Sequence, residues 1–142
     1  MAKLLDWEAR LGAYLDAVRL KPFGWGSHDC ILHCANGVKA QTGKDHARGM
    51  RGKYRSAASA ARFLKSLGHD SLVDLVTAKL GEPIPPSFAQ RGDIVMSEDG
   101  AFGICMGSNA FFVGQEGERP GLLMVHRNEK DRSWVHAWRV GG

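Results

Sequence analysis

Cys30 has the sequence surroundings of a cysteine nucleophile. It follows a loop rich in glycine and aromatic residues at positions 23–29, and an apolar pattern typical of a helix begins directly after it. A cysteine in the first turn of a helix lies next to unpaired backbone N–H groups and the positive end of the helix dipole, which favour the thiolate. Cysteine hydrolases pair such a thiolate with a histidine that acts as base. The next requirement is therefore a histidine within reach.

Three histidines are candidates for this base. His28 lies two residues before the cysteine in the same loop, and His33 lies about one helical turn after it. His136 alternates with Trp134 and Trp138 on a predicted strand, so we expect it to share a face with two large apolar side chains. That pattern is typical of a hydrogen-bonded core histidine, but a base that reaches across to the cysteine is the alternative. Both interpretations remain open.

Two further interpretations of Cys30 compete with the nucleophile. Free cysteine packs like a small apolar side chain, so Cys30 and Cys34 could both belong to the core. The spacing of His28, Cys30, His33 and Cys34 could also supply metal ligands, but zinc sites usually combine two separated ligand pairs. No second pair follows in the sequence. We therefore expect neither a metal nor a cofactor.

The elements that must position these residues fall into a helical first part and a strand-rich second part. Apolar spacing and capping residues predict four helices, over residues 4–19, between Asp29 and Gly43, between Ser56 and Gly68, and between Asp70 or Ser71 and Gly81. After a proline-rich connector, the pattern predicts strands over residues 94–96, 101–106, 111–113, 122–125 and 134–140. Helices followed by an antiparallel meander indicate an α+β fold with the helices on one face of the sheet.

Length and composition fit one ordinary globular domain spanning residues 1–142. The chain is 44% hydrophobic and 24% charged, and no linker divides it. Its first residues lack the apolar stretch of a signal peptide, and no apolar run has the length of a membrane span, so we expect no membrane association. Three cysteines argue against a disulfide framework and favour synthesis in a reducing compartment.

The net charge of +4 is concentrated between residues 39 and 65, where eight lysines and arginines accompany a single acid, Asp45. Arg48, Arg51, Lys53 and Arg55 form the centre of this basic segment. Such a segment could face nucleic acid, an anionic polymer such as cell-wall glycan, or an acidic partner, or it could simply be solvated. Only one aromatic residue interrupts the charges and no nucleic-acid recognition motif is present, so nucleic acid is the weakest of these.

Three segments resemble the NlpC/P60 family of papain-like cysteine peptidases. The first is the loop that ends at Asp29-Cys30. The second is residues 91–95, Arg-Gly-Asp-Ile-Val, similar to the family's Pro-Gly-Asp-Leu-Val. The third is residues 101–107, Ala-Phe-Gly-Ile-Cys-Met-Gly, similar to the family's His-Val-Gly-Ile-Tyr-Leu-Gly. The resemblance implies a papain-like α+β fold and, for many members, cleavage of peptides in the bacterial cell wall.

The sequence is also similar to a smaller family of unknown function from the tail modules of tailed phages and prophages. It shares the loop Gly-Trp-Gly-x-x-Asp-Cys at residues 24–30 and the segment Gly-x-Arg-Gly-x-Tyr-Arg at residues 49–55. It also shares Gln-Arg-Gly-Asp at residues 90–93 and a terminal Ala-Trp-Arg-Val at residues 137–140. This second resemblance implies a virion protein that is made in the host cytoplasm and is partnered by other tail-tip and hub proteins.

The chain departs from the NlpC/P60 pattern at the catalytic base. Ala101 occupies the position of the family histidine, and Phe112 or Val113 stands where a third polar residue is usual. A general base contributes about 10²–10⁴ in rate, so we do not expect Cys30 to hydrolyse amides by the usual family mechanism.

Three functions follow as hypotheses. The first is a structural tail-tip or baseplate-hub protein, a pseudoenzyme whose basic loop meets an acidic neighbouring subunit. The second is a cysteine endopeptidase that opens peptidoglycan peptides during injection, with Cys30 as nucleophile and His136 or His28 as an unusual base. Trp25 would line the substrate cleft in that case, or otherwise wedge its loop onto the core. The third, a nucleic-acid-binding module, rests on the basic segment alone.

Overall fold

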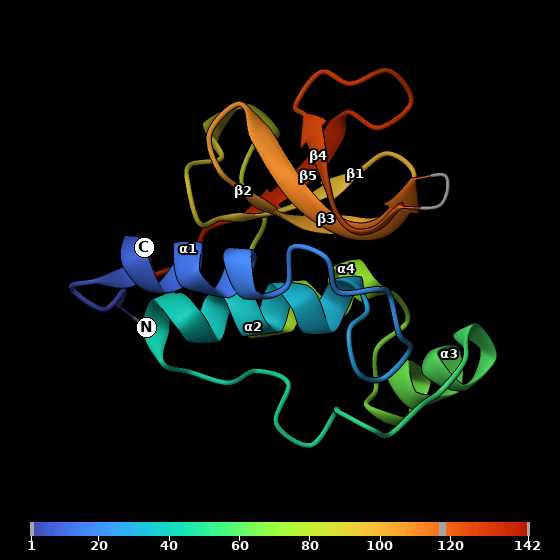
Figure 1. Cartoon of the computed structure of the whole chain (residues 1–142). Coiled ribbons are helices and arrows are strands. Elements are labelled where there is room, and N and C mark those ends of the chain that lie inside the picture. The colour runs from blue at the N-terminus through green and yellow to red at the C-terminus, as the bar shows by residue number, and fades with distance from the viewer. Residues whose placement is uncertain (1, 117–118, 142) are drawn as a thin grey trace.

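The computed structural model describes residues 2–116 and 119–141, and in them four α-helices and a five-stranded antiparallel sheet form an α+β domain (Figure 1). The helices are α1 (Trp7–Ala17), α2 (Cys30–Thr42), α3 (Ala57–Ser66) and α4 (Leu72–Leu80), followed by a short 3₁₀ helix, η1 (Pro86–Phe88). The strands are β1 (Ile94–Ser97), β2 (Phe102–Cys105), β3 (Asn109–Glu116), β4 (Arg119–His126) and β5 (Trp134–Trp138). The predicted α+β class is confirmed.

Side-chain caps start α2, α3 and α4 where the sequence predicted them, whereas α1 begins at Trp7 without a side-chain cap. Asp29 accepts a hydrogen bond from the N–H of Leu32 (2.9 Å) at the start of α2, and Gly43 ends that helix in the left-handed conformation (φ 81°). Ser56 and Ser71 cap α3 and α4 in the same way as Asp29. Within the described residues 2–116 and 119–141, no helix is long and apolar enough to cross a membrane.

The sheet order is β4-β3-β2-β1-β5, so the first four strands form the predicted meander and the fifth does not continue it. β5 crosses the sheet and pairs with β1, with Ile94 opposite Trp138. The sequence prediction failed at this point because neighbouring strands in the chain usually pair, and local periodicity carries no information about a return to the first strand. β1 therefore lies inside the sheet.

A bulge in β5 corrects the predicted environment of His136. The register of β5 against β1 shifts between Met96 and Ser97, and this shift turns Trp134 to the opposite face from Trp138. His136 therefore lies beside Trp138, with ring centroids 5.8 Å apart, but does not share a face with Trp134. The extra residue breaks the simple two-residue alternation from which the shared face was predicted.

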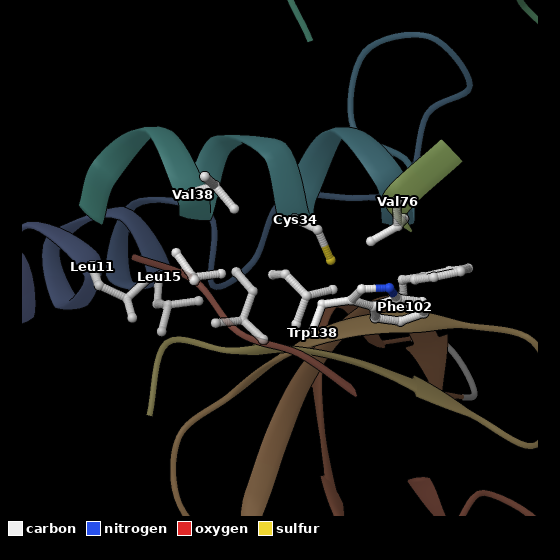
Figure 2. Close-up of a cluster of buried hydrophobic side chains, with 10 residues drawn as sticks. Leu11, Leu15, Cys34, Val38, Val76, Phe102 and Trp138 are labelled. Carbon is white, nitrogen blue, oxygen red and sulfur yellow. The ribbon is translucent and has the colours of Figure 1, made fainter. Parts of the chain in front are cut away.

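The main core lies between the helices α1, α2 and α4 and one face of the sheet. Figure 2 shows Cys34 on α2 directed toward the sheet, where the rings of Phe102 and Trp138 stack with centroids 5.7 Å apart. Gly37 allows α2 to lie close to β2, because a Cβ at this position would clash with the side chain of Ile104. This close approach holds the first turn of α2 over β2.

A buried carboxylate ties the start of β1 to the end of the chain. Asp93 is fully buried and accepts hydrogen bonds from the N–H of Gln90 (2.9 Å), the N–H of Val140 (3.0 Å) and the guanidinium of Arg139 (3.0 Å). Removal of this acceptor would leave buried donors without a partner, which is costly.

We predict that Asp93→Ala lowers the free energy of unfolding by about 3 kcal/mol, because it breaks a buried charge-assisted network. Urea denaturation measures this loss. Glu82→Gln is the control, because Glu82 is exposed and its substitution should change stability by less than about 0.5 kcal/mol. A loss below about 1 kcal/mol for Asp93→Ala would contradict this role of the network.

Candidate functional site

Cys30 is the first residue of α2 and lies half-buried where the loop 23–29 meets β2. Burial raises the pKa of its thiol to about 11, and the negative charge of Asp29 adds to the rise. The backbone N–H groups of Phe102, Ile31 and Cys30 itself favour the thiolate and oppose this rise only in part. The sequence led us to expect a thiolate at this helix start, but desolvation outweighs the helix N-terminus and Cys30 is a neutral thiol at neutral pH.

The side chain of Asp29 holds the cysteine loop together. It is 3% exposed and accepts three hydrogen bonds, from the N–H of Leu32 (2.9 Å), the N–H of Gly26 (3.1 Å) and the phenol of Tyr54 (2.6 Å). Burial and the neighbouring carboxylate both raise the pKa of the Tyr54 phenol, so this phenol remains a donor. The loop before Cys30 is therefore fixed from both sides.

A second contact joins the cysteine loop to the basic segment. The N–H of Gly52 donates to the carbonyl of Gly26 at 2.8 Å. Gly26 has a φ of 75°, and a Cβ at this position would clash with the carbonyl oxygen of Tyr54, so only glycine fits. Residues 50–54 thus act as a support for the cysteine loop in addition to carrying charge.

His33 is a core histidine. Its Nε2 lies 3.1 Å from the carbonyl oxygen of Phe111 and its Nδ1 lies 2.7 Å from the phenol of Tyr14. The carbonyl can only accept, so Nε2 carries the proton and Nδ1 accepts from Tyr14. Burial lowers the pKa of His33 to about 4. Both ring nitrogens are occupied, and His33 is not available as a base for Cys30.

His28, the sequence candidate nearest to the cysteine along the chain, is buried beside His33. It is 1% exposed, and its ring lies edge-on to that of His33 with centroids 5.7 Å apart. Burial, with a smaller contribution from Lys21, lowers the pKa of His28. Neither of its ring nitrogens has a hydrogen-bond partner among the described residues, so His28 and Cys30 do not form a hydrogen-bonded pair.

His136 is separated from the cysteine by a strand. His136 lies opposite Met96 on β1, and Met96 lies opposite Phe102 on β2. The N–H of Phe102 is the group that acts on the Cys30 thiol. Two strand spacings place the backbones of His136 and Phe102 about 10 Å apart. The structure thus does not bring the predicted catalytic residues Cys30, His28 and His136 together.

The residue next to the cysteine is Ala101. It directly precedes Phe102, and Gly100 on its other side lines the same groove as Cys30. The carbonyl of Ala101 accepts a hydrogen bond from the N–H of Ser97 (2.9 Å), which fixes the backbone at this point. The backbone of Ala101 therefore adjoins the N–H that acts on Cys30, whereas its methyl group packs against the cluster of Val95, Cys105 and Trp134, on the other face of the sheet from Phe102.

A groove of about 340 Å³ opens beside Cys30, between the cysteine loop, α3 and the start of α4. Trp25 lines it and is 43% exposed, and its ring meets that of Phe23 edge-on at 5.0 Å. The exposed aromatic pair therefore forms one side of the groove mouth.

The four predicted basic binding residues behave differently from one another. Arg51 donates to Asp45 (2.9 Å) and to the side chain of Asn36, so it holds its own loop. Arg48, Lys53 and Arg55 are exposed and do not line the groove. Three of the four cations are thus presented to solvent. Within residues 2–116 and 119–141, no group of three or more histidine, cysteine or acidic side chains is placed to hold a metal ion.

A protein-family model described as a domain of unknown function, DUF6950, matches residues 2–140. The chain belongs to this family. The match spans both the helical part and the sheet, so the DUF6950 domain and the α+β domain described above are the same unit. No curated protein matches the chain.

Two tyrosines of this DUF6950 domain have roles that the sequence analysis missed. Tyr54 binds the N-cap Asp29, and Tyr14 binds His33. Tyr54 stands inside the segment 49–55, where only the charges were interpreted, and Tyr14 lies within the helix predicted over residues 4–19. For Tyr54, the available signal was a lone tyrosine between glycines and cations. For the contact of Tyr14 with His33, no local sequence feature gave a signal.

We predict that acid destabilises the domain through its buried histidines. An unfolded histidine has a pKa near 6.5 and binds a proton as the pH falls, whereas folded His33 stays neutral down to about pH 4. The contribution of neutral His33 to the free energy of unfolding is therefore complete above about pH 6.5 and is lost as the pH falls toward 4. His33 alone should lower the free energy of unfolding by about 2 kcal/mol between pH 7.5 and pH 5.

Urea denaturation at these two pH values measures the change. His33→Gln removes the titrating group, so it should be less stable at neutral pH but show a smaller loss on acidification. The His126→Gln control should keep the full loss, because His126 is exposed. An equal loss in wild type and His33→Gln would show that His33 is not the source.

Proposed function

We propose that this protein is a structural component of the tail tip or baseplate hub of a tailed phage or phage-like particle. In this proposal it has an NlpC/P60-like, papain-like architecture without a complete catalytic set, and its partners are other tail-tip and hub proteins. Virion location and partner type rest on the sequence resemblance. The loss of catalysis is argued from the site.

The observation that carries the non-catalytic role is the surroundings of the Cys30 sulfur. Burial keeps the thiol protonated, with a pKa of about 11, and the adjacent position 101 carries only a methyl group. His33 is hydrogen-bonded in the core, and His136 lies across an intervening strand. A nucleophile needs a base within hydrogen-bond reach, and none of these histidines provides one.

The location is tested on intact particles from cells that produce this protein. Mass spectrometry of purified particles should detect the chain, and gold-labelled antibodies against it should mark one end of the tail. Detection of the chain only in the unassembled fraction of the lysate would contradict a structural role in the virion.

The second candidate is a cysteine endopeptidase that cleaves bacterial peptidoglycan peptides during injection. The groove that ends at Cys30 and the three N–H groups that favour its thiolate support this candidate. Its base would be His28 or His136. Release of peptide fragments from purified cell walls by wild type, but not by Cys30→Ala, would favour the enzyme over the structural protein.

We predict that Ala101→His restores reactivity to Cys30. The backbone of residue 101 adjoins the Phe102 N–H that acts on Cys30, so an imidazole that turns to this side of the sheet should lower the pKa of the thiol, and each unit increases the thiolate fraction tenfold. The rate of iodoacetamide alkylation of Cys30 at pH 7.5 should rise at least about tenfold over wild type. Mass spectrometry follows the reaction, with the buried Cys34 and Cys105 as internal references.

Ala101→Gln is the matched control, because it adds a side chain of similar length without a base. Its alkylation rate should remain close to that of wild type. A wild-type rate already equal to that of free cysteine would contradict the neutral thiol, and with it the argument for a non-catalytic site.

A further inference from the structure

We propose that the groove beside Cys30 binds an acidic segment of a partner protein that inserts an apolar side chain. This inference rests on the proposed binding role and gives it a location and a partner chemistry. Three features support it: the apolar lining of the groove, the unusual exposure of α3, and the charges along one wall.

The groove is lined mainly by apolar side chains. Phe23 and Trp25 form one side of its mouth, and Cys30 and Tyr54 lie on the wall next to them. The wall formed by α3 consists of Ala57, Ala60, Ala61, Phe63, Leu64 and Leu67. Its volume of about 340 Å³ is within the range of ligand-binding pockets. Small alanines alternate with larger side chains on this wall and leave room for an inserted apolar group.

The helix α3 packs Phe63 and Leu64 against a small core cluster around Leu75 and presents the rest of its apolar face to this groove. None of its residues is buried, and Leu67 at its end is 43% exposed. Figure 1 shows α3 away from the sheet, beyond the layer formed by α1 and α2. An amphipathic helix usually buries its apolar face against its own domain. Here that face, together with Phe23 and Trp25, is available to a partner, and exposed aromatic side chains are frequent anchors at protein interfaces.

Charges are distributed unequally along the groove. Lys53 and Arg55 flank Tyr54, so cations border this residue of the lining. Neither of these two cations forms an ion pair with any residue that the structure describes. Asp70 precedes the α4 wall and Asp99 precedes Gly100, so acids border the far side. Asp29 is inside the groove but its carboxylate is already hydrogen-bonded.

This pattern favours a partner segment with an acid next to an apolar anchor. The anchor would enter between α3 and the Trp25 loop, and the carboxylates next to it would meet Lys53 and Arg55. The neutral Cys30 thiol fits this use, because it adds a small apolar surface to the wall. A nucleic acid would instead need stacking aromatics along the cations, and Tyr54, the aromatic residue between them, is buried.

The experiment is selection of a random peptide library displayed on filamentous phage against the immobilised full-length protein. Selected sequences should combine Asp or Glu with Leu, Phe or Trp. The best peptide is then made with a fluorescent label, and its affinity is measured by fluorescence anisotropy. Bound peptide should also slow the alkylation of Cys30 at alkaline pH, because Cys30 lines the groove.

Variants of exposed residues locate the binding. Leu67→Glu should weaken binding at least about tenfold, because Leu67 lines the groove and is 43% exposed, and Lys53→Glu combined with Arg55→Glu should do the same and reduce the salt dependence. Arg62→Glu is the matched control, because Arg62 lies on α3 but does not line the groove, and it should bind like wild type. An unchanged urea midpoint shows that each variant is folded.

The proposal is overturned if the selected peptides lack acids, or if Leu67→Glu and Arg62→Glu affect binding equally. It is also overturned if no peptide is selected and the protein instead binds DNA or phosphatidylglycerol vesicles. These outcomes leave the structural role untouched. Conversely, Cys30-dependent release of cell-wall peptides would contradict the structural role without removing peptide binding from the groove.

Discussion

The site depends on one buried carboxylate. Asp29 caps α2, closes its own loop through Gly26 and accepts the Tyr54 phenol, so three separate parts of the chain meet at two oxygen atoms. A buried carboxylate is stable only when its hydrogen bonds are satisfied. Because Asp29 directly precedes Cys30, the same network that fixes the cysteine loop also places a negative charge beside the thiol. The carboxylate that fixes the loop therefore also raises the pKa of the Cys30 thiol and disfavours its thiolate.

Burial decides the chemistry of Cys30. The helix N-terminus and the N–H of Phe102 favour an anion, but the loss of water around the sulfur has the larger effect on its pKa. Without a base at position 101, nothing compensates for that loss. The surroundings of Cys30 combine an aromatic rim with an open groove, and we assign this groove to partner binding.

Local features of the fold were predictable from sequence, and long-range ones were not. Asp29, Gly43, Ser56 and Ser71 mark helix ends because capping depends on a few neighbouring residues. Two of the missed features join residues distant in sequence: the pairing of β5 with β1 and the hydrogen bond from Tyr54 to Asp29. The third, the bulge that turns Trp134 to the other face, breaks the regular period of the strand. At the site, the sequence left open whether Trp25 lines a cleft or packs on the core and whether a histidine reaches Cys30, because both depend on contacts between distant segments. The role of Arg51 as a loop support was not foreseen, because its partner Asp45 had been counted only as a stray acid.

The position of β5 has a consequence for how the domain forms during synthesis. β1 lies between β2 and β5, yet β5 comes almost 40 residues later in the chain, so one side of this interior strand waits for a late segment. Until residues 134–138 leave the ribosome, β1 has an open edge that can pair with another nascent chain. Contacts between such distant segments also slow folding. Completion of the sheet is therefore the last step of folding, and a chain interrupted before β5 would be prone to aggregate.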